Sequence, residues 1–287
     1  MALTRVTTRA SARTSTWMRA NVPAGVASLI WLAIVLVPVW SVLSWAVQGG
    51  DGFLSTGPLS WPSSFTVGNV GRVLEMGFAQ AFVNTLVVTV VSVALTLLCA
   101  IPGAYAIVRS RSRTVAAVFR AFLLGLAIPA QAVIIPVYLM IVRLGLYDTK
   151  AAIILPTVAF GLPLAILILV GTLRDVPREN YEAMALDGAG TFRTLWNLVV
   201  PMSRGSIIAV GVYAALQAWN GFLFPLILTQ SASQQVLTLN LWNFQTEHGV
   251  DMPGLMTAVL LSAFPVFVAY LLARRWLIAG MAGMGGK

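Results

Sequence analysis

The sequence has few charged residues. Asp, Glu, Lys and Arg together make up 9% of its 287 residues, whereas 59% are hydrophobic. A soluble globular domain has roughly 25% charged and 45–50% apolar residues. The composition therefore excludes an ordinary soluble protein. It indicates one bundle of helices whose apolar surface faces lipid.

The residues that carry most enzyme and metal chemistry are also scarce. Cys99 is the only cysteine and His248 the only histidine, so neither an intrachain disulfide nor a His and Cys metal site is possible within one chain. All nine acids map to loops or to the ends of apolar runs, which leaves no intramembrane carboxylate pair for catalysis. We expect no enzyme activity and no metal site. Cys99 is interpreted as a packing residue and His248 as a loop residue.

A phosphate-binding loop is missing as well. No glycine-rich loop followed by Lys-Ser or Lys-Thr is present, and Lys150 and Lys287 are the only lysines. The formal charge of +9 could indicate a nucleic-acid partner. However, most of the arginines cluster beside apolar runs, which is typical of membrane proteins. We therefore expect membrane lipid, and no nucleic acid, around this charge.

Six apolar runs are long enough to cross a bilayer. They are Ala24–Val47, Ala81–Val108, Val115–Val142, Ala151–Leu173, Ile207–Leu228 and Leu255–Ala273. The prolines inside them predict kinked rather than broken helices, because neighbouring helices and waters satisfy the freed backbone groups. The predicted fold class is an all-α membrane protein with six transmembrane helices.

The arginines give these helices an orientation. Four arginines precede the first run, four lie at 109–120 between the second and third runs, and Arg274, Arg275 and Lys287 follow the sixth. The segments 48–80, 144–150 and 229–254 on the opposite side are poor in positive charge. The positive-inside rule therefore places both termini in the cytoplasm of a multi-pass protein of the plasma membrane. The predicted parts are a tail at 1–23, a six-span domain at 24–276 and a tail at 277–287.

One cytoplasmic loop, 173–204, is too long and too patterned to be a plain linker. Pro177 can begin a helix at its first turn, and a Gly-rich stop follows from Gly188. These signals predict a short helix at Pro177–Gly188. A second short helix is expected at Phe192–Val199, ended by Pro201.

The same loop resembles the EAA loop of the permease subunits of ABC importers. The family pattern is Glu-Ala-Ala, a Gly four residues after the second Ala, and an Ile-x-Leu-Pro ending. Here Glu182, Ala183 and Met184 are followed by Gly188, and after nine more residues by Leu198-Val199-Val200-Pro201. The spacing of Gly and Pro agrees, and Met184 replaces the second Ala.

The resemblance implies that the helix in 177–190 docks on a separate ATPase subunit and couples it to the membrane helices. Its residue types suit such a role. Ala183 and Ala185 leave a low helix face, Gly188 permits a backbone angle that a Cβ resists, and Glu182 offers charge to a basic partner. The residues assigned to coupling are Glu182, Ala183, Met184, Asp187, Gly188, Ala189, Gly190 and Pro201.

Further segments resemble carbohydrate-importer permeases of the maltose type, in particular their second permease subunit. They are Phe82–Leu86, Pro136–Tyr138, Gly145-Leu146, Leu155-Pro156, Leu162-Pro163, Ala218–Phe222, Leu237–Gly254 and Arg275–Gly283. The chain is identified by this resemblance as a member of the binding-protein-dependent transport inner membrane component family, with a type I ABC importer permease fold in the bacterial inner membrane. The implied cargo is a sugar or oligosaccharide. The implied partners are a homologous permease, an extracytoplasmic solute-binding protein and two ATP-binding subunits; these hold ATP and Mg²⁺, and this chain binds no cofactor itself.

Polar residues inside the apolar runs are candidate pathway residues, because such residues are costly in a membrane. Gln217 and Asn220 share one helix face, and Tyr213 extends it to a stripe suited to sugar hydroxyls and ring faces. Asn84 and Gln131 are further candidates. Interhelical hydrogen bonding is the alternative role for all of them. The alternative function is a secondary transporter of a small polar solute, which usually carries intramembrane acids that this chain lacks.

Overall fold

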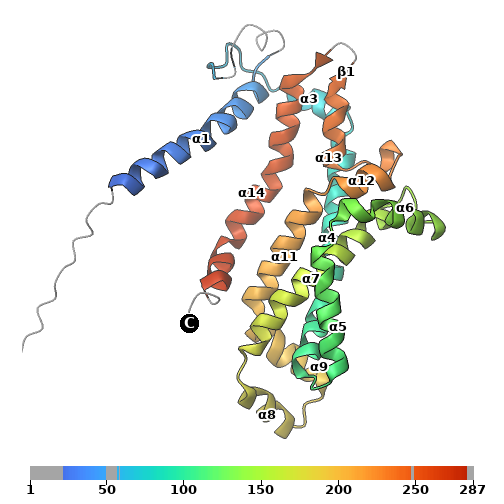
Figure 1. Cartoon of the computed structure of the whole chain (residues 1–287). Helices are drawn as coiled ribbons and strands as arrows, with labels where there is room; N and C mark the ends of the chain where they lie inside the picture. Colours follow the sequence, from blue (N-terminus) through green and yellow to red (C-terminus); the bar gives the residue numbers. More distant parts are fainter. Residues whose placement is uncertain (1–21, 50–56, 58, 247–248, 283–287) are drawn as a thin grey trace, which may run out of the picture.

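A computed structural model of the chain describes residues 22–49, 57, 59–246 and 249–282 and is largely helical (Figure 1). The tail segments 1–21 and 283–287 and His248 lie outside the described residues. The elements are α1 (Val22–Ala46), α3 (Gly68–Glu75), α4 (Phe78–Arg109), α5 (Arg113–Leu123), η1 (Leu124–Ala127), η2 (Ala130–Val133), α6 (Ile134–Arg143), α7 (Lys150–Arg174), α8 (Arg178–Leu186), α9 (Thr191–Thr194), η3 (Leu195–Val199), α10 (Val200–Met202), α11 (Arg204–Trp219), α12 (Leu223–Leu228), η4 (Ala232–Gln234), α13 (Leu237–Asn240), η5 (Leu241–Phe244), β1 (Gln245–Thr246), β2 (Gly249–Val250) and α14 (Met252–Ala282).

Within the described ranges, four helices are long and apolar enough to cross a membrane. They are α1, α4, α7 and the part of α14 up to Leu272. Two further crossings are bent: α5 with η1 meets η2 with α6 at 97°, and the segment α9–α10 meets α11 at 81°. Counting each bent pair as one crossing gives six candidate spans, which is the predicted number. The second pair runs from Thr191 to Trp219 and is therefore shifted from the predicted run 207–228. The short α3 and the β1–β2 hairpin lie at one end of the bundle, and α8 and α9 at the other (Figure 1).

The third predicted span, 115–142, is broken rather than kinked, so the expectation of kinks alone is wrong here. The break falls at Ile128 and Pro129, between η1 and η2. Proline disfavours the helical region for the residue before it, and Ile128 is extended, with φ −88° and ψ 112°. Prolines elsewhere lie inside continuous helices, at Pro38, Pro102, Pro156, Pro163 and Pro265.

The fifth predicted span, 207–228, is also interrupted. The helix α11 ends at Trp219, and α12 begins only at Leu223. Asn220 caps α11, and the N–H of Gly221 donates to the carbonyl of Ala218 at 3.2 Å to form a turn. The prediction of a single continuous helix over 207–228 is therefore wrong.

The prediction that Pro201 ends the second loop helix is wrong as well. The chain continues through the π-helical segment η3 and through Pro201 to Met202, and it turns at Ser203. In η3 the N–H of Val200 donates to the carbonyl of Leu195, five residues back. Proline has no N–H, so Pro201 needs no carbonyl partner where the hydrogen-bond spacing changes from five residues back to four. The helix therefore continues through it.

The main packing of the bundle joins α4 to α7, with α11 alongside. Ala100 and Ala104 of α4 are completely buried in one cluster with Leu169 and Leu173 of α7. Small residues let two membrane helices approach closely. Cys99, in the same helix, is exposed, so its interpretation as a packing residue is wrong.

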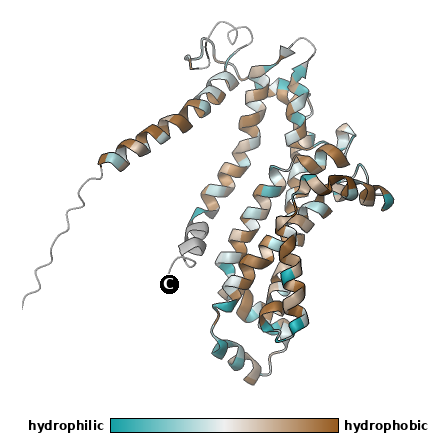
Figure 2. Cartoon of the chain, viewed as in Figure 1, coloured by the Kyte–Doolittle hydropathy of each residue, from teal (hydrophilic) through white to brown (hydrophobic). Residues whose placement is uncertain are grey.

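The first helix, α1, leans away from the bundle (Figure 1). Its residues 22–39 are exposed, although most of them are apolar (Figure 2). It is attached at its far end, where the carbonyl of Ala46 accepts hydrogen bonds from Asn69 Nδ2 of α3 at 2.8 Å and from Thr257 Oγ1 of α14 at 2.9 Å. Lipid or another chain is therefore required to cover the shaft of α1.

Near the α3 end of the bundle, α4 is tied to the segment before α13. Asn84 is completely buried, and its Nδ2 donates to the carbonyls of Ser233 and Gln235, both at 2.8 Å. Its Oδ1 accepts from Gln80 Nε2 at 3.0 Å. All the bonding capacity of the Nδ2 group serves to hold the chain together, which gives Asn84 a structural role.

We predict that Asn84→Ala lowers the stability of the purified chain by roughly 1–3 kcal/mol, because two buried carbonyl groups lose their donor. Thermal unfolding in detergent measures this effect. Asn197→Ala serves as the control, since Asn197 is exposed on η3. Equal melting temperatures for the two variants would contradict the structural role of Asn84.

Candidate functional site

The helix α8 is a short element with well-defined ends at the tip of the bundle (Figure 1). Pro177 precedes it, and Gly188 follows it with φ +68°. The N–H of Gly188 donates to the carbonyl of Ala185 at 3.1 Å, and that of Ala189 to the carbonyl of Met184 at 2.9 Å. This pair of bonds is a Schellman C-cap with glycine at the left-handed position. The predicted helix at Pro177–Gly188 is confirmed.

The outer face of α8 combines small, acidic and apolar side chains. Glu182, Ala183 and Ala185 are exposed, and Leu186 is 90% exposed. Phe192 and Trp196 of the following helical segment are also exposed, at 74% and 51%. Large apolar side chains exposed in this way are candidates for contact with lipid or with another protein.

No other part of the described chain packs against the Cα of Gly188. A Cβ added to Gly188 would have no atom within 4 Å, so only the backbone angle demands glycine here. Asp187 and Gly190 are exposed beside it. Of the assigned residues in 182–190, Met184 and Ala189 are half-buried and the others are exposed. Pro201 lies in α10 beside Met202, whose sulfur accepts from Asn180 Nδ2 of α8 at 3.6 Å.

The inner face of α8 is anchored to the end of α4. Tyr181 is 6% exposed, and its ring lies 6.4 Å from the ring of Tyr105. The guanidinium of Arg109 lies 4.7 Å from the centre of the Tyr181 ring, a cation–π contact. Burial raises the pKa of Tyr181, so its hydroxyl stays neutral.

Sequence reasoning missed this anchor. The aromatic residue directly before Glu182 was the available signal, because adjacent helix positions point about 100° apart. This pattern does not show which residues Tyr181 packs against, because Tyr105 and Arg109 belong to a distant part of the sequence.

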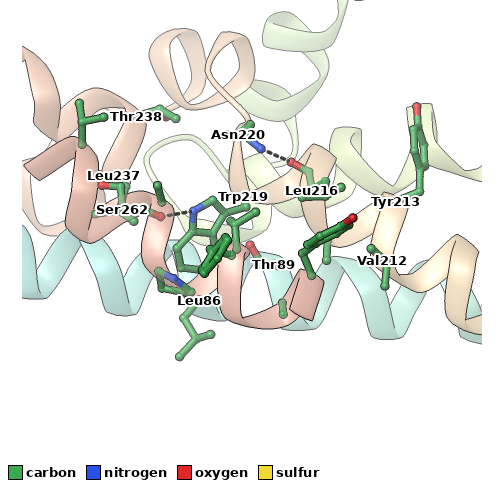
Figure 3. Close-up of a pocket in the computed structure, with 18 of the residues that line it drawn as sticks. Leu86, Thr89, Val212, Tyr213, Leu216, Trp219, Asn220, Leu237, Thr238 and Ser262 are labelled. Carbon is green, nitrogen blue, oxygen red and sulfur yellow. Dashed lines mark hydrogen bonds between the residues drawn. The ribbon is translucent and has the colours of Figure 1, made fainter. Parts of the chain in front are cut away.

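A second feature is a cavity of about 990 Å³ between α11 and α14, to which α4 and α13 add further lining residues (Figure 3). Its wall is mainly apolar. Several of its polar groups are already bonded within the chain: Trp219 Nε1 donates to the carbonyl of Ser262 at 3.1 Å, and Thr238 Oγ1 to that of Gly221 at 2.7 Å. Thr89 also lines the cavity, and its buried hydroxyl has no hydrogen-bond partner among the described residues.

The predicted polar stripe on α11 is split by this cavity. Tyr213 and Asn220 line it, and Asn220 Nδ2 donates to the carbonyl of Leu216 at 2.9 Å (Figure 3). Gln217 is exposed and is absent from the lining, because the cavity face follows Val212, Leu216 and Trp219. A contact between Gln217 and substrate stays a prediction.

The other two pathway candidates lie away from this cavity. Asn84 is buried and bonded as described above. Gln131 is exposed in η2, at the break of the third span. The structure therefore groups Tyr213 and Asn220 and separates the remaining candidates from them.

A family model described as "Binding-protein-dependent transport system inner membrane component" matches residues 92–283, which is more than half of the chain. The chain belongs to this family. An ABC transporter permease protein of Caldicellulosiruptor sp. (strain Rt8B.4) is 33% identical over 252 residues, covering 88% of this chain and 92% of the relative. The diacetylchitobiose uptake system permease protein of Streptomyces coelicolor is 29% identical, covering 90% and 85%.

The fold is also shared with a solved transporter. A chain in the crystal structure of a bacterial ABC transporter for import of the acidic polysaccharide alginate superposes with a TM-score of 0.78 at 20% identity, covering 92% of this chain and all of that one. The predicted type I permease fold is confirmed. Family membership excludes the secondary transporter and makes this chain the membrane component, with ATP hydrolysis on a separate subunit.

We predict that Tyr181→Ala frees α8 from α4, whereas Tyr181→Phe does not, because the buried hydroxyl has no hydrogen-bond partner among the described residues. Loss of a buried aromatic ring costs about 3 kcal/mol or more, which corresponds to roughly a hundredfold faster amide exchange if α8 opens locally. Hydrogen exchange of residues 178–186 measures this. Equal protection in the alanine and phenylalanine variants would refute the anchor.

Proposed function

We propose that this chain is one of two permease subunits of an ATP-driven sugar importer and that α8 passes the movement of the ATPase to the membrane helices. The observation that carries this proposal is the two-sided character of α8. On its outer face, Ala183, Leu186 and the carboxylate of Glu182 are available to a partner. On its inner face, the buried Tyr181 ring is held by the guanidinium of Arg109. A docking element must have both properties to transmit force.

The proposal includes an orientation and a set of partners. The α8 end of the bundle faces the cytoplasm, as the arginine clusters at 109–120 and after the sixth span favour. The opposite end, with α3 and the β1–β2 hairpin, then meets the solute-binding protein. A homologous permease supplies the other half of the pathway. Two ATP-binding subunits, with their ATP and Mg²⁺, dock below, one of them on α8.

The cavity at α11 and α14 supports the role of half a pathway. Its wall is too apolar to hold a polar solute by itself, so a second wall from another chain is needed. Tyr213 and Asn220 offer the aromatic face and amide that suit a sugar ring and its hydroxyl groups. A saccharide cargo agrees with the diacetylchitobiose and alginate systems to which this chain is similar.

We predict that Gly188→Asp and Glu182→Lys each abolish uptake while the chain still inserts in the membrane. The first forces a Cβ into a left-handed backbone at about 1–2 kcal/mol and adds a charge to the docking face. The second reverses a charge on that face. Uptake of labelled oligosaccharides by cells, with membrane abundance measured in parallel, tests both.

The matched control for the charge reversal is Glu75→Lys, since Glu75 is exposed at the opposite end of the bundle, on α3. Because that end is proposed to meet the solute-binding protein, the control is judged by co-purification of the ATPase with the tagged chain. Co-purification should match that of the unmodified chain in Glu75→Lys and fall in Glu182→Lys. Normal uptake with either α8 variant at normal abundance would remove the coupling assignment.

The pathway residues give a separate prediction. Tyr213→Ala and Asn220→Ala should lower uptake severalfold, whereas Tyr213→Phe should retain most of it if the ring stacks on the sugar. Co-purification of the ATPase with the tagged chain should stay unchanged in all three, because α8 is untouched. Undiminished uptake in both alanine variants would show that this face does not contact the cargo.

A further inference from the structure

A second, smaller cavity of about 370 Å³ lies where α4 and α7 end and α5 passes beside them. Two arginines line it, Arg120 of α5 and Arg174 of α7, together with Ser110 after α4. The remaining wall is apolar and includes Ile107 and Phe119. It shares no lining residue with the α11–α14 cavity.

The two arginines lack a neutralising partner. In the part of the chain that the structure describes, the one ion pair within 4 Å joins Arg72 to Asp251, near the α3 end of the bundle. Arg120 makes only a long hydrogen bond of 3.4 Å from its Nε to the carbonyl of Ala116, which leaves its terminal nitrogens available. No acid lines the cavity. Two guanidinium groups that share a pocket without an acid repel each other and favour an anion between them.

Ser110 adds a hydroxyl donor to this pair. Its Oγ accepts a hydrogen bond from the N–H of Ser112 at 3.1 Å, so its own proton remains free to donate. The neighbouring Arg109 is held over the Tyr181 ring and is no member of the pocket. Planar guanidinium groups with a hydroxyl donor match the oxygens of a phosphate, which accept several charge-assisted hydrogen bonds.

The helix beside the cavity, α5, is the first part of the bent third crossing and packs beside α4 and α7 (Figure 1). None of its residues is buried, and Val118 and Phe122 are exposed together with Arg120. Basic residues near the end of a crossing lie at the headgroups, while the neighbouring apolar residues face the acyl chains. Paired arginines with an apolar wall suit a lipid, whose chains continue from the phosphate, better than a free anion.

We propose that this cavity binds the phosphate of an anionic phospholipid headgroup through Arg120, Arg174 and Ser110. Basic pockets between membrane helices recognise such headgroups. The site needs only that this end of the bundle lies at a membrane surface. Its assignment to the cytoplasmic leaflet rests on the proposed orientation, whereas the lipid contact itself is independent of transport.

The test counts lipids bound to the full-length chain in its purified complex by native mass spectrometry. Phosphatidylglycerol and phosphatidylcholine are titrated separately. The expected result is preferential retention of phosphatidylglycerol, reduced at least about tenfold in Arg120→Gln/Arg174→Gln. The control is Arg111→Gln/Arg113→Gln, which removes the same charge from the same region outside the cavity lining and should keep the preference.

Three results would overturn the proposal. They are equal retention of both lipids, an unchanged preference in Arg120→Gln/Arg174→Gln, and an equal loss in the control. Arg174→Gln alone is a milder variant, expected to give part of the loss, should the double variant fail to assemble. A final arm offers inorganic phosphate alone: binding that depends on Arg120 and Arg174, without any lipid preference, would assign the site to free phosphate and refute the lipid.

Discussion

The close packing of α4 against α7 is the interaction on which the rest of the structure depends. Ala100 and Ala104 are completely buried, and Gly103 also lies close to Ile166 of α7. Within a bilayer the hydrophobic effect gives no drive for helices to associate, so tight contact between small residues must supply it. This contact places the ends of both helices side by side, and these ends carry Arg109, the base of α8 and the basic cavity.

From that base, two connections run from α8 to the membrane helices. Tyr181 ties α8 directly to α4 through Tyr105 and Arg109. The chain itself continues through α9, η3 and α10 to the corner at Ser203 and then into α11, which carries Tyr213 and Asn220. A displacement of α8 would therefore act on two of the helices that line the larger cavity, α4 and α11. A π-helical segment within this route is the kind of irregularity that often occurs at functional sites.

The sequence predicts what local signals determine. The bounds of α8 follow from Pro177 and from the left-handed Gly188, which act on their immediate neighbours. Features that depend on distant residues were missed. Tyr181 meets a helix far away in the sequence. The hydrogen-bond partners of Asn84, a pathway candidate with interhelical bonding as its alternative role, lie about 150 residues further on. The break at Ile128 was mistaken for a kink because hydropathy continues smoothly through it.

In the proposed mechanism, α8 is the element to which the ATPase binds. Cysteine cross-linking in membranes tests this directly, with Cys99→Ser removing the only native thiol and Ala183→Cys adding one to the exposed face of α8. A maleimide that carries a photoreactive benzophenone forms a thioether with the introduced thiol and, on illumination, inserts into a C–H bond of a protein in contact with it. This reagent should join the Ala183→Cys chain to the ATPase subunit, while a cysteine at Glu75 on α3 should give no such product. An intact complex in which Ala183→Cys forms no cross-link to the ATPase would contradict the account.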